Sequence, residues 1–186
     1  MKKIMSLVLA MMICLSTALA LAEEQKYIHL DPKPEGSITM KEANINNLLF
    51  FMWPSEWSWM ELSESVAQRG CIALGTDSRQ EMGICIKVHR MDTATEPEEL
   101  REKLLEADNG ISSIEIRKNN FDETVLSFQS DDGEILGCFI LIDEKTAVSI
   151  EYTYFFSNKY IDENDLLRDY WSITIDNLRI EDEQPE

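Results

Sequence analysis

Apolar and polar residues alternate with a period of two over much of the chain, which predicts paired β-strands. The first clear case lies between residues 71 and 91, where "CIALGTDSRQEMGICIKVHRM" has an apolar residue at every second position of both arms. The alternating positions are Ile72, Leu74, Met82, Ile84, Ile86 and Val88. The sequence "GTDSRQ" between the arms is rich in turn-forming residues, so this stretch is predicted to be a β-hairpin.

The second half of the chain contains four more strand-like runs separated by short turn sequences. They cover residues 111–119, 123–130, 134–143 and 147–156, and their connections are "NNFD", "SDDG" and "DEKT". Strands joined by such short turns pair with their neighbours in sequence, which predicts an antiparallel meander. One earlier run, "NNLLFFMWP", is predicted to be a short buried strand that ends at Pro54.

Two segments have the spacing of apolar residues that is typical of amphipathic helices. The first covers residues 96–108, where Thr95 and Glu98 have the spacing of a capping box and Pro97 is tolerated in the first turn. The second runs from about residue 163 to 178. Its apolar positions are Leu167, Tyr170, Trp171, Ile173, Ile175 and Leu178.

This order of elements predicts an α+β fold, with an antiparallel sheet of about five to six strands flanked by two helices in a layered sandwich. Residues 43–180 are expected to form a single domain, because no internal repeat or low-complexity linker divides them. Residues 23–42 are polar and are expected to form a flexible lead-in that could include an early strand. Residues 181–186 are expected to form an acidic tail.

Several of these features together resemble the PsbP-like fold, which photosystem II extrinsic proteins share with Ran-binding Mog proteins and small exported bacterial proteins. The resemblance lies in an apolar strand that leads into Pro54-x-x-Trp57, the hairpin, the helix at 96–108, "SDDGEILGCFILI" and "NDLLRDYWSITIDNL". It covers about residues 40 to 180. The resemblance implies a non-enzymatic accessory or binding module, but no photosystem-specific or Ran-contacting residue can be assigned here.

The N-terminal 22 residues have the three parts of a secretory signal peptide. Lys2 and Lys3 give a positive start, residues 4–15 are apolar, and Ala20 and Ala22 supply the small residues before a cleavage site. Cleavage after Ala22 would direct the protein to the cell envelope or the exterior, whereas an uncleaved segment would act as an anchor. No later segment is apolar over a length that spans a bilayer.

The strongly negative charge limits the classes of partner. The chain has 35 acidic and 17 basic residues, a formal net charge of −18 at pH 7. Proteins bind nucleic acids and anionic membrane surfaces through Lys and Arg side chains. We therefore do not expect this acidic chain to bind nucleic acid. The acidity is consistent with solubility outside the cell, or with a basic partner.

The sequence "FFMWPSEWSW" holds three of the four tryptophans within seven positions. One interpretation is that Trp57 fills one end of the core under a helix. The other is an aromatic surface that binds a partner or ligand, made of Met52, Trp53, Trp57, Trp59 and Met60.

Three cysteines remain after the signal segment, and two of them belong to the predicted hairpin. Cys71 and Cys85 fall on the same face of its two arms, in a register that allows them to lie directly opposite each other. They are therefore candidates for a disulfide, the alternative being two buried thiols. Cys138 is expected in the core. His89 lies on the face of Cys85, but no spacing demands a metal, so neither a metal nor a cofactor is predicted.

These observations favour an exported, non-enzymatic accessory or binding domain that contacts a protein or a cell-envelope component. The alternative is a small-molecule binding protein with an aromatic groove between sheet and helix. An enzyme is the third class, and no motif with the spacing of a catalytic site supports it.

Overall fold

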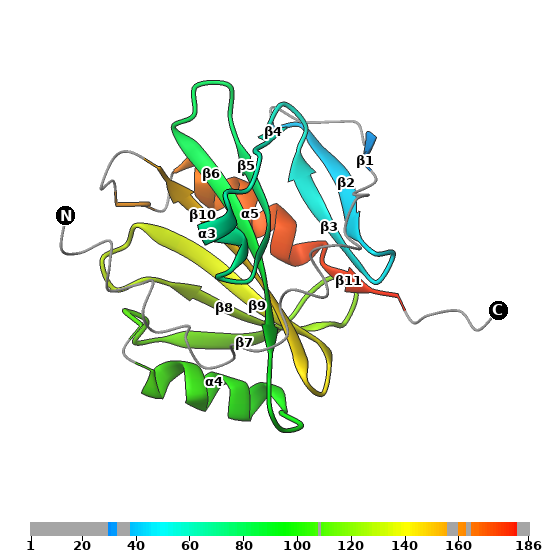
Figure 1. Cartoon of the computed structure of the whole chain (residues 1–186), viewed down its shortest axis with the longest axis vertical. Helices are drawn as coiled ribbons and strands as arrows, with labels where there is room; N and C mark the ends of the chain where they lie inside the picture. The colour runs from blue at the N-terminus through cyan, green and yellow to red at the C-terminus, as the bar shows by residue number, and fades with distance from the viewer. Residues whose placement is uncertain (1–29, 33–37, 108, 156–159, 163–164, 182–186) are drawn as a thin grey trace.

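The computed structural model describes residues 30–32, 38–107, 109–155, 160–162 and 165–181, which form two antiparallel sheets and three helices (Figure 1). The predicted signal peptide, most of the predicted lead-in and all but the first residue of the predicted acidic tail lie outside these ranges. In the part of the chain that is described, none of the helices combines the length and the apolar character needed to cross a membrane.

The larger sheet has seven strands in the order β4-β5-β6-β10-β9-β8-β7. Their bounds are Ser58–Trp59 (β4), Cys71–Thr76 (β5), Met82–Arg90 (β6), Ile114–Lys118 (β7), Thr124–Gln129 (β8), Ile135–Asp143 (β9) and Thr146–Tyr154 (β10). All neighbours are antiparallel. The predicted hairpin is confirmed as β5–β6 and the predicted meander as β7–β10. The pairing of β6 with β10 joins the two units into one sheet.

A separate four-stranded sheet has the order β1-β2-β3-β11. Its strands are Leu30–Pro32 (β1), Met40–Ile45 (β2), Leu49–Pro54 (β3) and Arg179–Ile180 (β11). The sequence pattern indicated β3 but missed β2. Asn46 and Asn47 both have positive φ, 53° and 55°, and asparagine tolerates this left-handed conformation well enough to form a tight hairpin turn.

The prediction of one sheet with five to six strands is therefore wrong in number, although the α+β class is correct. The described residues contain seven strands in one sheet and four in another. The prediction missed strands of only two residues and strands whose partner is distant in the sequence, as for β11 with β3. Such pairings leave no periodic signal in the sequence.

The two faces of the seven-stranded sheet are covered by different elements. Alternate side chains of a strand point to opposite faces, so Val125 and Ile140 belong to one core and Leu126 and Phe139 to the other. The first core also includes residues of β3 and of helix α5, Leu166–Asp176. The second includes Leu100 of helix α4, Pro97–Glu106. The sheet therefore lies between α5 with the small sheet on one side and α4 on the other.

Both predicted helices are present, but their ends differ from the prediction. The N-cap of α4 is Glu96, and the hydroxyl of Thr95 donates to the carbonyl of Thr93, so the predicted capping box is wrong. Helix α5 is shorter than predicted because Asp165 caps its start, accepting a hydrogen bond from the backbone N–H of Leu167. A third, four-residue helix, α3 (Glu64–Ala67), precedes β5.

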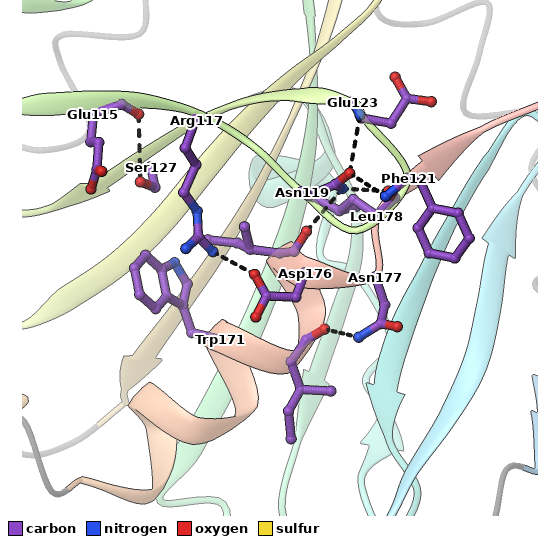
Figure 2. Close-up of polar contacts among 12 residues, drawn as sticks. Glu115, Arg117, Asn119, Phe121, Glu123, Ser127, Trp171, Asp176, Asn177 and Leu178 are labelled. Carbon is purple, nitrogen blue, oxygen red and sulfur yellow. Dashed lines mark hydrogen bonds and ion pairs between the residues drawn. The ribbon is translucent and has the colours of Figure 1, made fainter.

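The C-terminal end of α5 is fastened to the turn between β7 and β8, as Figure 2 shows. The side-chain amide of Asn119 donates to the carbonyls of Ile175, at 3.0 Å, and Leu178, at 2.5 Å. The carbonyl oxygen of the same side chain accepts from the backbone N–H groups of Phe121 and Glu123 within the turn. Asn119 therefore links the turn to the last turn of α5 and to the residue that precedes β11.

Candidate functional site

The residues predicted to form an aromatic surface lie mostly in the core. Met52, Trp53 and Trp57 are buried, Trp59 is half-buried, and Met60 is 37% exposed. The ring of Trp53 stacks on that of Trp59, with 3.4 Å between their centroids, and its indole N–H donates to the carbonyl of Trp57. Trp57 packs edge-on against Tyr152 and Tyr170.

The five residues therefore do not form one exposed patch, and the core interpretation of Trp57 is confirmed. The physical reason is that the chain turns back after β3. The backbone N–H of Trp57 donates to the carbonyl of Pro54, and β4 then pairs with the end of β5. This turn places Trp57 between the large sheet and α5, so its side chain fills the space in which the small-molecule alternative requires a groove.

A group of polar side chains occupies the other face of the large sheet, at its centre. Lys87 on β6 pairs with Ser149 on β10, and Cys85 pairs with Glu151. Directly paired residues point to the same face, and residues two apart on one strand do so as well. The same face therefore carries a polar cluster made of Cys71, Cys85, Lys87, His89, Ser149 and Glu151.

Hydrogen bonds connect four members of the polar cluster in a row. Lys87 Nζ lies 2.5 Å from Glu151 Oε2, and the Ser149 hydroxyl donates to Glu151 Oε1. His89 Nε2 lies 2.9 Å from the Ser149 oxygen. Because the serine proton is used toward Glu151, His89 must donate through Nε2, which assigns its tautomer. Glu151 and the neighbouring Ser149 are buried, so the ion pair of Lys87 with Glu151 lies in a region with little water.

The two thiols of the polar cluster contact each other beside this row. Cys71 Sγ and Cys85 Sγ are 3.1 Å apart, and both cysteines are free. The predicted register is corrected, because Cys71 pairs with Lys87 and Cys85 with Leu74. The pairing of Leu74 with Cys85 and of Ala73 with Ile86, continued without interruption, would place Cys71 opposite Val88. The bulge between Cys71 and Ala73 instead moves Cys71 opposite Lys87, diagonal to Cys85, and so brings the sulfurs together.

The environment separates the two thiols chemically. The hydrogen bond from Cys85 lowers the pKa of Cys71; burial opposes this effect, and the charge of Lys87 adds to it. The same hydrogen bond, together with burial, raises the pKa of Cys85 well above its usual value. Cys71 is therefore the thiol that more readily becomes a thiolate, the nucleophilic form of cysteine.

The pKa values of the two basic side chains of the polar cluster, His89 and Lys87, are shifted in opposite directions. Burial lowers the pKa of His89 to about 4, so this ring is neutral at physiological pH. Burial, the largest single effect, disfavours the charge on Lys87, but the adjacent carboxylate of Glu151 together with Cys85 and Cys71 outweighs it, and the pKa of Lys87 is raised. Lys87 is therefore the permanent positive charge beside the two sulfurs.

The sequence located part of the polar cluster. It placed Cys71 and Cys85 together and put His89 on the same face, but it missed Ser149 and Glu151, which come from β10. The signal that could have found them is the alternation in "AVSIEYTY", whose polar positions oppose those of "CIKVH" only once β10 is known to pair with β6. Cys138 lies in the other core, as expected, where burial raises its pKa to about 12.

The polar cluster does not have the form of a metal centre. Within the described ranges, no group of three or more His, Cys, Asp or Glu side chains is placed to share an ion. His89 uses Nε2 for Ser149, and its ring packs against Phe139. The chemistry that the polar cluster supports is that of a dithiol next to a fixed positive charge.

A second feature is a pair of exposed apolar side chains, Tyr160 before α5 and Leu166 at its start. Tyr160 is 61% exposed and Leu166 is 41% exposed, yet both are held by the fold. The Tyr160 ring packs on Gly133, and the next residue, Ile161, donates its N–H to the Gly133 carbonyl. Asp165, directly before Leu166, donates its N–H to the carbonyl of Asp162.

Three exposed aspartates belong to the same two segments as Gly133 and these side chains. Asp131 and Asp132 precede Gly133 in the turn under the Tyr160 ring, and Asp162 lies between Tyr160 and Leu166 in the chain. We call the set the Tyr160 surface: Tyr160, Leu166, Asp131, Asp132 and Asp162. An exposed aromatic ring with an acidic border is suited to a partner that presents apolar and basic groups.

Comparisons with known proteins give no family for this chain. No family model matches it, and no curated protein matches it. Among solved structures, a protein from Bacteroides thetaiotaomicron VPI-5482 aligns with 73% of this chain at 15% sequence identity and a TM-score of 0.42. The alignment covers 46% of that protein, so this chain spans about half its length.

Proposed function

We propose that the chain is an exported, non-enzymatic α+β domain that binds a protein or a cell-envelope component through the Tyr160 surface. The observation that carries this proposal is the placement of Tyr160, whose ring is fixed on Gly133 while most of it stays exposed. A pre-positioned aromatic side chain loses little conformational entropy on binding, which is why tyrosine is enriched at the centre of protein interfaces.

The charge distribution favours a partner with basic groups. Asp131, Asp132 and Asp162 are exposed around the apolar residues, and the chain as a whole is strongly acidic. Opposite charges at the border of an interface increase the association rate and orient the partner. The resemblance to PsbP-like proteins stays a prediction, and it favours the same class of function, since characterised members act mostly through protein contacts.

The test is capture of envelope proteins by the immobilised intact protein and by two variants. Tyr160→Ser removes the exposed ring, and Phe121→Ser is the matched control because Phe121 is 47% exposed at a different turn. We expect capture to fall at least tenfold for Tyr160→Ser and to stay unchanged for Phe121→Ser. Binding should also weaken between 0.05 and 0.5 M salt.

Two outcomes would contradict the proposal. Equal capture by both variants would mean that the Tyr160 surface is not the contact. A thermal shift with small ligands that persists in Tyr160→Ser, without protein capture, would favour the small-molecule alternative instead.

A further inference from the structure

The Cys71–Cys85 contact has the geometry of a dithiol ready to close. The sulfurs are 3.1 Å apart on neighbouring antiparallel strands, and a disulfide bond is about 2.0 Å long, so closure requires the sulfurs to approach by roughly 1 Å. Both residues are anchored in strands of the large sheet. Cys138 points to the opposite face and cannot compete as a partner.

The positive charge of Lys87 lies beside both sulfurs, and its direct cross-strand position is opposite Cys71. Lys87 is the direct cross-strand partner of Cys71, and directly paired side chains are closer than diagonal ones. The Cys71 sulfur also lies 3.3 Å from the carbonyl of Ala73 and contacts Cys85. A thiolate at Cys71 would be stabilised by the Lys87 ammonium and by the Cys85 S–H, whereas Cys85 lies directly opposite the carboxylate of Glu151 on β10, which disfavours a thiolate there.

The segment before Cys71 provides a route by which a small reagent reaches the buried sulfur. Strand β4 pairs only with Gly75 and Thr76, so within the described part of the chain no strand pairs with the outer side of the Cys71 end of β5. The helix α3 lies against β5, but it has only four residues, none of them buried, and its N-cap makes no side-chain hydrogen bond. Elements with so few buried contacts open at low free-energy cost.

We propose that Cys71 and Cys85 form a reversible disulfide in which Cys71 is the attacking thiol, Lys87 is the positioning residue, and the oxidant is a low-molecular-weight disulfide. The Cys71 thiolate attacks one sulfur of the oxidant, forming a mixed disulfide and releasing the first thiolate. Cys85 then loses its proton and attacks Cys71 Sγ, which releases the second thiolate. Two electrons pass to the oxidant, which leaves as two thiols, and the intramolecular bond remains.

The first test is equilibration of the intact protein with glutathione buffers of increasing oxidised fraction, followed by acid quenching, unfolding, alkylation and mass spectrometry. We expect two thiols to be lost together at a single midpoint while Cys138 stays alkylatable. Cys138→Ser is the matched control and should give the same midpoint. If all three thiols remain alkylatable in fully oxidised buffer, the proposal is overturned.

The order of attack is tested with single variants. Cys85→Ser blocks the second step, so glutathione should accumulate on Cys71 as a mixed disulfide. In the Cys71→Ser variant, at least tenfold less glutathione should accumulate on Cys85. Equal labelling of the two variants, or preferential labelling of Cys85, would overturn the assignment of Cys71 as the attacking thiol.

The role of Lys87 is tested by the pH dependence of the oxidation rate. Lys87→Met with Glu151→Gln removes both charges, so no unpaired carboxylate is left buried, and Lys87→Arg keeps the positive charge. The neutral pair should shift the midpoint of the pH–rate profile upward. Below the midpoint it should slow oxidation about three- to fourfold for each pH unit of that shift, because less thiolate is present but each thiolate is more nucleophilic. Lys87→Arg should restore the wild-type profile. An unchanged profile in the neutral pair would show that Lys87 only fills space.

Discussion

Thr174 shows how one buried hydroxyl connects three parts of the molecule. It lies on α5, has no exposed surface, donates to the carbonyl of Met52 on β3 and accepts from the hydroxyl of Tyr152 on β10. The helix, the small sheet and the large sheet meet at this oxygen. Thr174 stands among apolar residues on the buried side of α5. Its hydroxyl is needed there because it provides a hydrogen-bond partner for both the Met52 carbonyl and the Tyr152 hydroxyl.

Replacing Thr174 by valine should destabilise the protein more than replacing it by serine. Valine keeps the shape but leaves the Met52 carbonyl and the Tyr152 hydroxyl without partners, at a cost of about 1–3 kcal/mol each. Serine keeps both hydrogen bonds and loses only a methyl group. The free energy of unfolding from urea denaturation measures the difference, and equal stability of the two variants would contradict this account of Thr174.

His89 should make stability depend on pH between about 4 and 6.5. Its pKa in the folded state is lowered to about 4 by burial, below the ordinary value of 6.5. In this pH range the unfolded chain binds a proton that the folded protein does not, so stability falls as the pH is lowered from 6.5 to 4. The full effect is about 3 kcal/mol for a shift of this size.

The measurement is the free energy of unfolding against pH for the wild type and for His89→Gln. The charged neighbours of His89, Glu151 and Lys87, are present in both proteins, so the difference curve isolates the histidine. The difference should grow from pH 6.5 down to 4 and then level off. A flat difference curve would mean that His89 is protonated as easily in the folded state as in the unfolded chain.

Among the elements, the turn between β7 and β8 is stabilised by contacts with α5 more than by its own sequence. Asn119 makes four hydrogen bonds, two within the turn and two to carbonyls at the end of the helix. Arg117 adds an ion pair with Asp176 at 3.0 Å and lies over the Trp171 ring (Figure 2).

Asn119→Ala should therefore destabilise the protein by about 2–6 kcal/mol, because each of its four hydrogen bonds contributes about 0.5–1.5 kcal/mol. Asn120→Ala is the matched control, since the Asn120 side chain is exposed and the backbone N–H that bonds to Asp176 is kept. Hydrogen exchange should also show faster opening at the end of α5 in the first variant alone. A loss below 0.5 kcal/mol for Asn119→Ala would refute the fastening role.

The contact between the two sheets depends on a glycine in β5. A Cβ added at Gly75 would overlap the ring of Trp53, which is fully buried and stacked on Trp59. Gly75→Ala should cost about 1–3 kcal/mol through overpacking. Ser78→Ala, at an exposed position of the same hairpin, is the control. A change in tryptophan emission should accompany the loss of stability, and an unperturbed Gly75→Ala protein would contradict the packing.

For the whole molecule, the net charge of −18 sets the response to salt. Repulsion among like charges disfavours the compact state, and ions screen it. The melting temperature should therefore rise between 0.02 and 0.5 M sodium chloride, as measured by calorimetry. A fall would indicate that the ion pairs, such as that of Lys87 with Glu151, outweigh the repulsion.

The sequence predicted the parts of the fold that local patterns encode. The alternation in β5 and β6 and the short turns of the meander were sufficient, because neighbouring strands pair with each other. The pairings of β6 with β10 and of β11 with β3 were not predictable, since they join residues far apart in the sequence. Two of the six residues of the polar cluster, Ser149 and Glu151, come through such a pairing, and they were missed for that reason.

The aromatic stretch shows a second limit of sequence reasoning. The clustering of tryptophans makes Trp53 and Trp57 noticeable in the sequence. It does not show whether other elements of the fold bury these side chains. Burial was decided by the turn at Pro54 and by the absence of a side chain at Gly75, which makes room for an indole ring. Tyr160 gave no comparable signal, because a single tyrosine in a polar segment is ordinary.

The pairing of β11 with β3 has a consequence for the order in which the protein is made. Strand β3 is complete at residue 54 and can pair with β2 on one edge, but β11, its partner on the other edge, begins at residue 179. At about 5–20 residues per second, a ribosome needs on the order of ten seconds to synthesise the intervening chain. During that interval one edge of a strongly apolar strand is open, which is the period when a nascent chain most needs a chaperone.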